Sequence, residues 1–436
     1  MSHIISSLLG LNDKNITIND QKFSKISIKG RLSFLLTGQL IEPISHCPCC
    51  GQSAINYSIV KNGSRTSRIQ LIPMAGYPTY LDLKKQRYYC KSCHSSFTAQ
   101  TPEVARHCHL SNHLKRYIAD QLTHTISETY IAQLVHVSIH TVRRVTNQMA
   151  QHLQFKPLHS LPQHLCFDEF KSVRTIDAAM SFIYCDAKTH RLVDLFFDRK
   201  QSSLIRYFQQ FPLETRQSVQ TITIDMYRPY MDLIQKVFPK AQIIIDKFHL
   251  IQALNRELNR TRIHVMNTFR NKDNRLYNKH KRYWRLIMTP RNKLHTTTYQ
   301  RYRLFDWITN TSGIVDYLLA SSSELKVTYE VVHHLREALQ DLRIDRFEFW
   351  VNYGLTLPVS KKLKTVLRTF RRYHTFIQNT FNYSTLTNGP IEGLNNKIKV
   401  LKRNAYGYRN YSHFKNRILL MMRLYLPNQS STSVAF

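Results

Sequence analysis

The sequence has few acidic residues for its length. It contains 28 Asp and Glu against 62 Lys and Arg among 436 residues, so the formal net charge is +34 and the isoelectric point lies near 10.0. A chain with so few carboxylates is expected to bind a polyanion. Because the basic residues run along the whole chain among 24 Tyr and 22 Phe, the composition indicates a folded nucleic-acid enzyme rather than a ribosomal-type or membrane-surface protein.

Long apolar runs are also missing. No stretch approaches the roughly 18 consecutive apolar residues that a membrane span requires. The early apolar segment 4–11 is short, contains two serines and has no Lys or Arg before it, which makes it a poor signal peptide. We therefore expect an intracellular protein with no membrane partner.

The length favours two to four domains, at roughly 100–200 residues per domain, and no repeat of 20–50 residues is apparent. Changes in pattern divide the chain into six segments. We expect an unclear N-terminal segment (1–40), a zinc ribbon (41–100), a helix-turn-helix (109–153), the first part of an α/β core (162–250), a helical insertion (251–385) and the C-terminal helices of the core (386–428).

Cysteines are scarce outside one segment, where five of the eight lie. Cys47 with Cys50, and Cys90 with Cys93, have the Cys-x-x-Cys spacing that turns two thiolates toward one point, and two such pairs supply the four ligands of a tetrahedral Zn²⁺ site. The alternative is a set of buried structural cysteines. Cys49 leaves open which two of the first three cysteines are ligands.

Helical spacing of apolar residues over 109–153 predicts two short helices joined by a tight turn. Ser127 and Ser138 are suited to cap them. In a helix-turn-helix, the second helix would present a polar face to a DNA major groove. The residues on or beside that face are His140, Thr141, Arg143, Arg144 and Asn147. An ordinary helical hairpin with a solvated face is the alternative.

The block 162–250 predicts three strands in an antiparallel meander, followed by α-β-α-β-α. This is the element order of a ribonuclease-H-like fold. With the preceding modules and the insertion, the fold class is a multidomain α/β protein, with a ribonuclease-H-like core that carries a large all-α insertion.

Three acids fall where such a core would place them. Asp168 lies on the first strand, Asp225 ends the fourth strand and Glu392 follows a helix start near the C-terminus. Two-metal phosphoryl transfer requires carboxylates that hold Mg²⁺ or Mn²⁺. Each acid also has a structural alternative, as a turn acid, a helix cap or a first-turn acid. Asp246 also ends a strand, and we assign it with His249 to a supporting role.

The last helix and the segment after it are basic. Asn396 and Lys399 lie four and seven residues after Glu392 and share its helical face, where a phosphate could be held beside the metal. Basic residues then alternate with tyrosines, a pattern suited to contacts with DNA backbone and bases, or alternatively a solvated face. The DNA-binding candidates here are Lys399, Lys402, Arg403 and Arg409.

With these motifs in view, the chain resembles transposases of the ISL-three family of bacterial insertion sequences. The resemblance runs from about residue 46 to residue 420, through the cysteine pairs, the helix-turn-helix, the "FDEF" strand and the long stretches 222–258 and 388–419. It implies a DDE transposase with a helical domain between the second Asp and the Glu. It places the triad at Asp168, Asp225 and Glu392, and it suggests terminal inverted repeats as the bound DNA.

We therefore predict an insertion-sequence transposase that uses two Mg²⁺ or Mn²⁺ ions in its active site and one structural Zn²⁺. Its partners would be double-stranded DNA and further copies of itself, as a homodimer or higher oligomer, in the bacterial cytoplasm at the nucleoid. Two alternatives remain at this stage. One is a non-catalytic DNA-binding regulator that retains a transposase fold, and the other is a nuclease without strand transfer.

Overall fold

The computed structural model describes residues 9–153, 160–176 and 179–422. It divides into two compact units. The first contains the N-terminal part through residue 156, residues 173–177 and everything from Asn396 onward, and the second contains residues 157–172 and 178–395. The interdomain stretch expected before residue 162 falls largely outside the described residues, as do residues 423–428 of the C-terminal segment.

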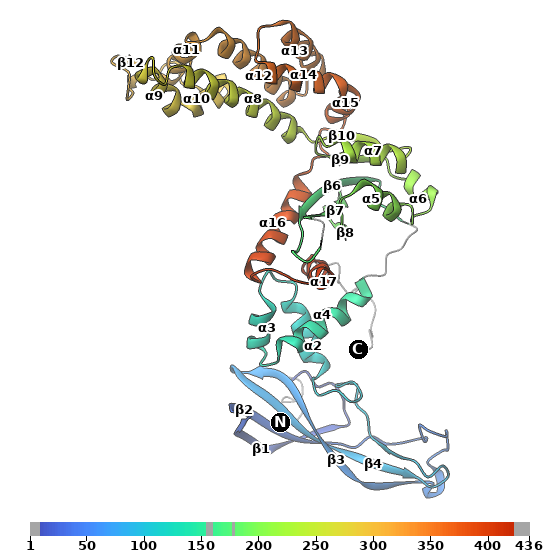
Figure 1. Ribbon diagram of the computed structural model, residues 1–436. Coiled ribbons are helices and arrows are strands. Elements are labelled where there is room, and N and C mark those ends of the chain that lie inside the picture. The colour runs from blue at the N-terminus through green and yellow to red at the C-terminus, as the bar shows by residue number, and fades with distance from the viewer. Residues whose placement is uncertain (1–8, 154–159, 177–178, 423–436) are drawn as a thin grey trace. The chain divides into compact units, whose positions relative to one another are not determined.

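A five-stranded sheet forms the N-terminal part of the first unit, shown in blue in Figure 1. Its strands are β1 (Ile16–Ile28), β2 (Arg31–Leu40), β3 (Ile59–Met74), β4 (Tyr77–Cys90) and β5 (Ser96–Thr98). The order is β1-β2-β4-β3, and β5 also pairs with β4. Segment 1–40 was expected to be unclear, whereas its strands β1 and β2 join the sheet that carries the cysteines, because β2 pairs in parallel with β4.

Three helices follow the sheet, where the sequence pattern predicted two. They are α2 (Asn112–Gln121), α3 (Glu128–Leu134) and α4 (Ile139–Leu153). Ser127 accepts a hydrogen bond from the Tyr130 amide, and Ser138 accepts one from the Thr141 amide, so both caps form as expected. Buried apolar residues of all three helices make one core, and Leu420 from the far end of the chain belongs to it.

The second unit is built on another five-stranded sheet. Its strands are β6 (His164–Lys171), β7 (Met180–Asp186), β8 (Leu192–Phe196), β9 (Thr221–Ile224) and β10 (Gln242–Ile245), in the order β10-β9-β6-β7-β8. β6, β7 and β8 form an antiparallel meander, and β9 and β10 run parallel to β6. Both β9 and β10 are almost entirely buried, which their β-branched sequences TITI and QIII favour.

Short helices connect these strands and complete the core. They are α5 (Gln201–Phe208), α6 (Leu213–Gln217) and α7 (Arg228–Val237). Phe167 of the central strand β6 stacks on Phe208 of α5 at 5.5 Å between ring centroids, and both side chains are fully buried. Burying a side chain of this size stabilises the fold by about 1.5–3 kcal/mol, so this contact fixes the strand that carries Asp168.

A helical lobe follows β10 and is seen in Figure 1 as the helices α8 to α15. These are α8 (Lys247–Thr268), α9 (Asn274–Arg282), α10 (Trp284–Met288), α11 (Thr311–Ala320), α12 (Ser323–Gln340), α13 (Ile344–Thr356), α14 (Lys361–Arg372) and α15 (His374–Asn382). The lobe is not all-α, because the strands β11 (Gln300–Arg301) and β12 (Ile308–Thr309) form a small hairpin. Thr380 of α15 donates a hydrogen bond to the carbonyl of Ile245, which fastens the returning chain to β10.

Two helices end the described chain, α16 (Gly389–Asn404) and α17 (Tyr411–Met421). The sequence analysis assigned both to the α/β core. The first turns of α16 do belong to that unit, but its remainder and all of α17 belong to the first unit. Within the described residues, no helix combines the length and the apolar composition needed to span a bilayer.

Candidate active site and DNA-binding surface

Two adjacent parallel strands bring the first two predicted catalytic acids together. Asp168 lies on β6, and Asp225 directly follows the last residue of β9, which pairs with β6. Both carboxylates line one cavity of about 270 Å³. Its other lining residues are Glu169, Met226, Tyr227, Tyr230, His249, Gln252, Ala253 and Arg256. Asp168 and Asp225 are 57 residues apart in sequence, so the sheet topology creates this acidic site.

Asp246 and His249 lie beside these acids, and their supporting role stays a prediction. The His249 Nε2 atom is 2.7 Å from the Asp225 Oδ1 atom. Asp246 is buried, with an exposed fraction of 3%, and accepts a hydrogen bond from the backbone amide of Asn388. The hydrogen bond to Asp225 raises the pKa of His249 above its ordinary value. A protonated His249 would therefore neutralise part of the charge on Asp225.

The electrostatics of the pocket favour a bound cation. Burial, together with the charges of Asp225 and Glu169, raises the pKa of the Asp168 carboxyl to about 7. Burial likewise raises the pKa of Asp246. Glu169 is already paired, since Arg199 Nη1 lies 2.5 Å from its Oε2 atom. Among the described residues, Asp168 is therefore the carboxylate of the β6 pair that forms no ion pair with a Lys or Arg side chain.

Two asparagines that the sequence analysis did not single out hold the aspartates. The side-chain amide of Asn388 donates to Asp225 Oδ1 at 3.1 Å, and that of Asn395 donates to Asp168 Oδ2 at 2.7 Å. Both asparagines are buried, and their Oδ1 atoms have no hydrogen-bond partner among the described residues. The pattern "NGPIEGLNN" contains both, but helical spacing alone does not show which of two consecutive asparagines faces inward.

Glu392 lies in the first turn of α16 and is exposed. It does not line the cavity that holds Asp168 and Asp225, although its charge contributes to the raised pKa of Asp246. Asn396 and Lys399 are also exposed and belong to the part of α16 in the first unit. The asparagine that contacts an active-site acid is Asn395. The phosphate-holding role of Asn396 and Lys399 stays a prediction.

The four predicted zinc ligands converge in the first unit. The Sγ atoms of Cys47, Cys50, Cys90 and Cys93 all lie within 4.8 Å of one another. Four thiolates at this separation fit the tetrahedral coordination of Zn²⁺. The second pair comes from the end of β4 and the turn after it, and Cys49 lies outside the cluster. The geometry thus selects Cys47 and Cys50 from the first three cysteines.

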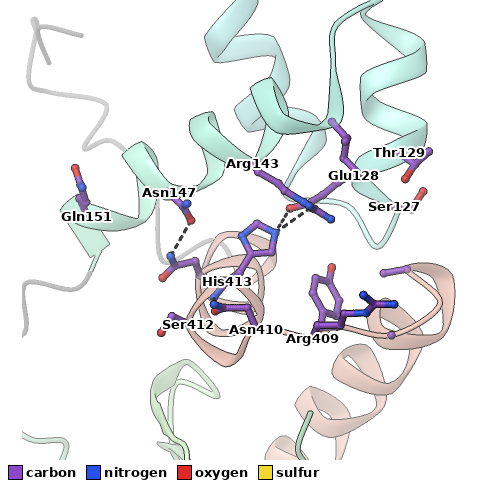
Figure 2. A pocket seen from close by; sticks show the side chains of 15 residues that line it. Ser127, Glu128, Thr129, Arg143, Asn147, Gln151, Arg409, Asn410, Ser412 and His413 are labelled. Carbon is purple, nitrogen blue, oxygen red and sulfur yellow. Dashed lines mark hydrogen bonds and ion pairs between the residues drawn. The ribbon is translucent and has the colours of Figure 1, made fainter. Parts of the chain in front are cut away.

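The helix-turn-helix carries the predicted DNA-binding residues on α4. His140, Arg143, Arg144 and Asn147 are exposed, and Thr141 is partly covered by the Ser138 cap. Arg143 and Asn147 also line a cavity of about 800 Å³, drawn in Figure 2. In the second half of the chain, Arg403 and Arg409 are exposed and Lys402 is half-buried.

Helix α17 forms the opposite wall of this cavity (Figure 2). The His413 Nε2 atom lies 2.8 Å from Oε1 of Glu128, which is buried at the start of α3. Burial opposes the ionisation of Glu128, but the hydrogen bond from His413 and the charge of Arg417 lower its pKa below the usual value. Arg417 is fully buried and donates to backbone carbonyls around the end of α2, including those of His124 and Ile126. Sequence spacing gave no sign of this contact.

Comparison with known proteins agrees with this arrangement. Three family models match consecutive parts of the chain: "zinc-finger of transposase IS204/IS1001/IS1096/IS1165" over residues 44–93, "Helix-turn-helix domain of transposase family ISL3" over residues 99–148, and an ISL3-family model described as "Transposase" over residues 165–418. The last match alone covers more than half of the chain and contains all three predicted catalytic acids.

Two curated relatives were found. The "Transposase for insertion sequence element IS1001" of Bordetella parapertussis is 24% identical over 358 residues, which is 80% of this chain and 82% of that protein. An "ATP-dependent protease" of Lactococcus lactis subsp. lactis is 41% identical over 109 residues, which is 25% of this chain but only 34% of that protein. The printed name describes the Lactococcus protein, and this partial match does not carry a protease activity over to the present chain. From the three consecutive family matches, the chain belongs to the ISL3 family of insertion-sequence transposases.

Proposed function

We propose that the protein cuts DNA at the terminal inverted repeats of its own insertion sequence and joins the freed 3′ ends to new DNA. Asp168, Asp225 and Glu392 are the proposed catalytic carboxylates. The observation that carries this proposal is the convergence of Asp168 and Asp225 from neighbouring parallel strands on one cavity. The transposase named for IS1001, which aligns over most of both chains, supports the same activity.

We also assign the second unit to the ribonuclease-H-like class. Numbered along the chain, its strand order is 5-4-1-2-3, with strands 1 to 3 antiparallel and strands 4 and 5 parallel to strand 1. This order puts the end of strand 4 beside strand 1, which is the adjacency that the proposed triad requires. The helical lobe then lies between the second Asp and the Glu in sequence.

The residues of the cavity fit divalent metal ions. Asp168 and Asp225 of the cavity, together with Glu392 from the first turn of α16, would hold two Mg²⁺ or Mn²⁺ ions, since carboxylate oxygens are the ligands that these hard cations prefer. Burial, together with the neighbouring charges of Asp225 and Glu169, raises the pKa of Asp168, and a bound cation would lower it. When bound, such ions activate an attacking oxygen and neutralise the leaving oxygen in phosphoryl transfer.

The protein's own side chains would position the reactants. Asn388 and Asn395 orient the two aspartates through the hydrogen bonds described above, and Arg199 keeps Glu169 from competing with Asp168. Arg256 lines the cavity as an exposed cation and is suited to a DNA phosphate. In the first step a water oxygen loses a proton and bonds to phosphorus, while the bond from that phosphorus to the element's 3′-oxygen breaks and this oxygen takes up a proton. In the second step the 3′-hydroxyl loses its proton and bonds to a phosphorus of the target, while the bond from that phosphorus to a target 3′-oxygen breaks and the departing oxygen is protonated.

DNA recognition is assigned to the first unit. The exposed residues of α4 would contact base edges and phosphates, and the zinc ribbon, held by the four cysteines, would support this surface. Lys399, Lys402, Arg403 and Arg409 would add phosphate contacts. Because a transposase must bring two element ends together, we propose a dimer or higher oligomer on DNA, acting at the bacterial nucleoid.

An Asp225→Ala variant tests this function. It should bind a duplex with the element's terminal repeat as tightly as the wild type but lose Mg²⁺-dependent cleavage and joining, because the helix-turn-helix lies in a different unit from the acid. Equal cleavage by both proteins would remove Asp225 from the mechanism. A wild type that binds but never cuts would support the DNA-binding regulator, and one that cuts but never joins would support a nuclease.

A further inference from the structure

Tyr406 is the most conspicuous side chain in the C-terminal basic segment. Its exposed fraction is 100%, and its backbone lies in the left-handed region at φ 53°, which disfavours residues other than Gly and Asn. Gly407 follows at φ 99°. A large aromatic ring that is both exposed and held in a strained turn gains nothing from folding, which points to contact with a ligand.

The turn that presents Tyr406 is fixed by hydrogen bonds. The Tyr406 amide donates to the Arg403 carbonyl at 3.0 Å, and the Gly407 amide donates to the Lys402 carbonyl at 2.9 Å. The side chain of Asn404 donates to the carbonyl of Thr125, just before α3, at 2.7 Å. The ring therefore has a defined position beside the helix-turn-helix, within the first unit.

Tyr406 lines an open hollow of about 420 Å³. Its lining residues are Ile126, Ser127, Tyr130, Arg403, Asn404 and Tyr406. Tyr130 is itself 54% exposed. Two tyrosine rings and one guanidinium match the chemistry of a nucleotide, because the rings can stack on a base and the guanidinium can bind a phosphate. Its volume lies in the range of about 300–1,000 Å³ typical of small-ligand sites.

The hollow adjoins the proposed DNA surface. Ser127 lines both it and the larger cavity of Figure 2, whose walls include Arg143, Asn147 and Arg409. Tyr408, two residues after Tyr406, has the opposite environment, since it stacks on the buried Phe414 at 4.6 Å between ring centroids. Tyr408 is thus half-buried against α17, whereas Tyr406 is fully exposed.

We propose that this hollow binds one unpaired nucleotide of DNA, with the base stacked on Tyr406 and the phosphate beside Arg403. Paired bases inside a duplex are covered on both faces by their neighbours, so an exposed ring can stack only on a base that is unpaired or at a strand end. The proposal rests on the proposed function for the source of that nucleotide, since cutting an element end creates free strand ends.

The test uses fluorescence anisotropy with the full-length, zinc-loaded protein and two labelled probes. One is a blunt duplex, and the other is the same duplex with a short single-stranded thymidine tail. The wild type should bind the tailed duplex at least about fivefold more tightly, as expected for stacking of one base. Tyr406→Asn should abolish this preference and leave blunt-duplex affinity within about twofold, whereas Tyr406→Phe should retain it.

The Tyr406→Asn variant distinguishes a contact of Tyr406 with DNA from a role of Tyr406 in the stability of the fold. Asn adopts the left-handed region more readily than Tyr, so Tyr406→Asn should keep or raise the melting temperature while it loses the tail preference. Tyr57 is the matched control, because it is 81% exposed at φ 56° in the zinc-ribbon region. Tyr57→Asn should leave the preference intact.

Two results would overturn the proposal: a wild type that binds both probes equally, or a Tyr406→Asn protein that keeps the preference. Either result is distinguishable from failure of the proposed function, which would appear as loss of cutting and joining in the wild type. Tail preference with no cleavage would therefore support the nucleotide site and count against the catalytic assignment alone.

Discussion

At the scale of single residues, the site depends on which of several similar neighbours faces inward. Asp168 and Glu169 are adjacent acids, and in the part of the chain that the structure describes it is Glu169, not Asp168, that pairs with Arg199. Asn395 and Asn396 are adjacent amides, and only Asn395 contacts Asp168. Such choices depend on side-chain direction in the folded chain, so composition and spacing could not settle them.

The asparagine pair gives a first prediction. Asn395→Ala should reduce Mg²⁺-dependent cleavage by about 10- to 100-fold, the usual effect of losing a partner that orients a metal ligand, with DNA binding unchanged. Asn396→Ala, one position along the same helix, should leave cleavage near the wild-type rate. Single-turnover cleavage of a labelled element end measures both. A larger loss for Asn396→Ala would restore the assignment made from sequence.

The cysteine cluster gives a second prediction, in which one of two adjacent residues is the test position and the other is its control. Cys50→Ser should lower bound zinc well below one ion per chain and unfold the ribbon, because a hydroxyl is a poor zinc ligand. Cys49→Ser should keep one zinc, because Cys49 lies outside the cluster. Zinc content measured by mass spectrometry decides the matter, and zinc loss in the Cys49 variant alone would reverse the ligand assignment.

At the scale of elements, the strands and helices of the α/β core were predicted from the sequence more accurately than those of the first unit. Alternating apolar residues and strand-ending acids predicted β6 to β10 in order, because period-two burial and β-branched runs are local signals. The strands β1 and β2 lacked such a pattern. The docking of α17 on α4 joins segments more than 250 residues apart, and local periodicity carries no information about such a contact.

The buried Arg417 tests that docking. Arg417→Lys should leave at least one of the carbonyls of Leu122, His124 and Ile126 without a donor, at a cost of about 1–3 kcal/mol. Amide hydrogen exchange in α2 to α4 should accelerate accordingly. Lys397→Arg, an exposed charge-conserving change on α16, serves as the control. Unchanged exchange in the Arg417 variant would show that α17 does not stabilise the helix-turn-helix.

The helical lobe should lose stability in mild acid. Burial lowers the pKa of both His280 and His333 to about 4, below the value near 6.5 of an unfolded chain. The unfolded state therefore takes up protons first as the pH falls from 6.5 toward 4, and each histidine should cost about 2 kcal/mol at pH 5. These groups stop affecting the free energy of unfolding above about pH 7.5, where both states are deprotonated.

Tryptophan fluorescence reports on this lobe specifically, because all three tryptophans, Trp284, Trp307 and Trp350, lie in it. Denaturant unfolding at pH 7 and pH 5 measures the difference for the wild type. A double variant, H280N with H333N, should show a smaller difference between the two pH values. Equal wild-type stability at both values would contradict the buried, neutral state of the two histidines.

At the scale of the whole molecule, the net charge of +34 and the three family matches are consistent with a chain that first binds DNA and then acts on it. The zinc ribbon and helix-turn-helix precede the α/β core in the chain, and the last helix of the family's transposase region returns to pack on the helix-turn-helix within one unit. Binding and chemistry are thus assigned to different units, and helix α16 belongs to both. Substitutions in one unit should therefore spare the other unit's task.

The central claim is that one chain both cuts its own element end and joins it to new DNA through Asp168, Asp225 and Glu392. The direct measurement incubates purified protein and Mg²⁺ with a labelled duplex carrying the element's terminal repeat and a plasmid target, comparing the wild type with Glu392→Ala. Label should enter the plasmid with the wild type alone. Joining by the Glu392→Ala protein would contradict the triad, and binding without cutting or joining by a folded, zinc-loaded wild type would contradict the transposase mechanism.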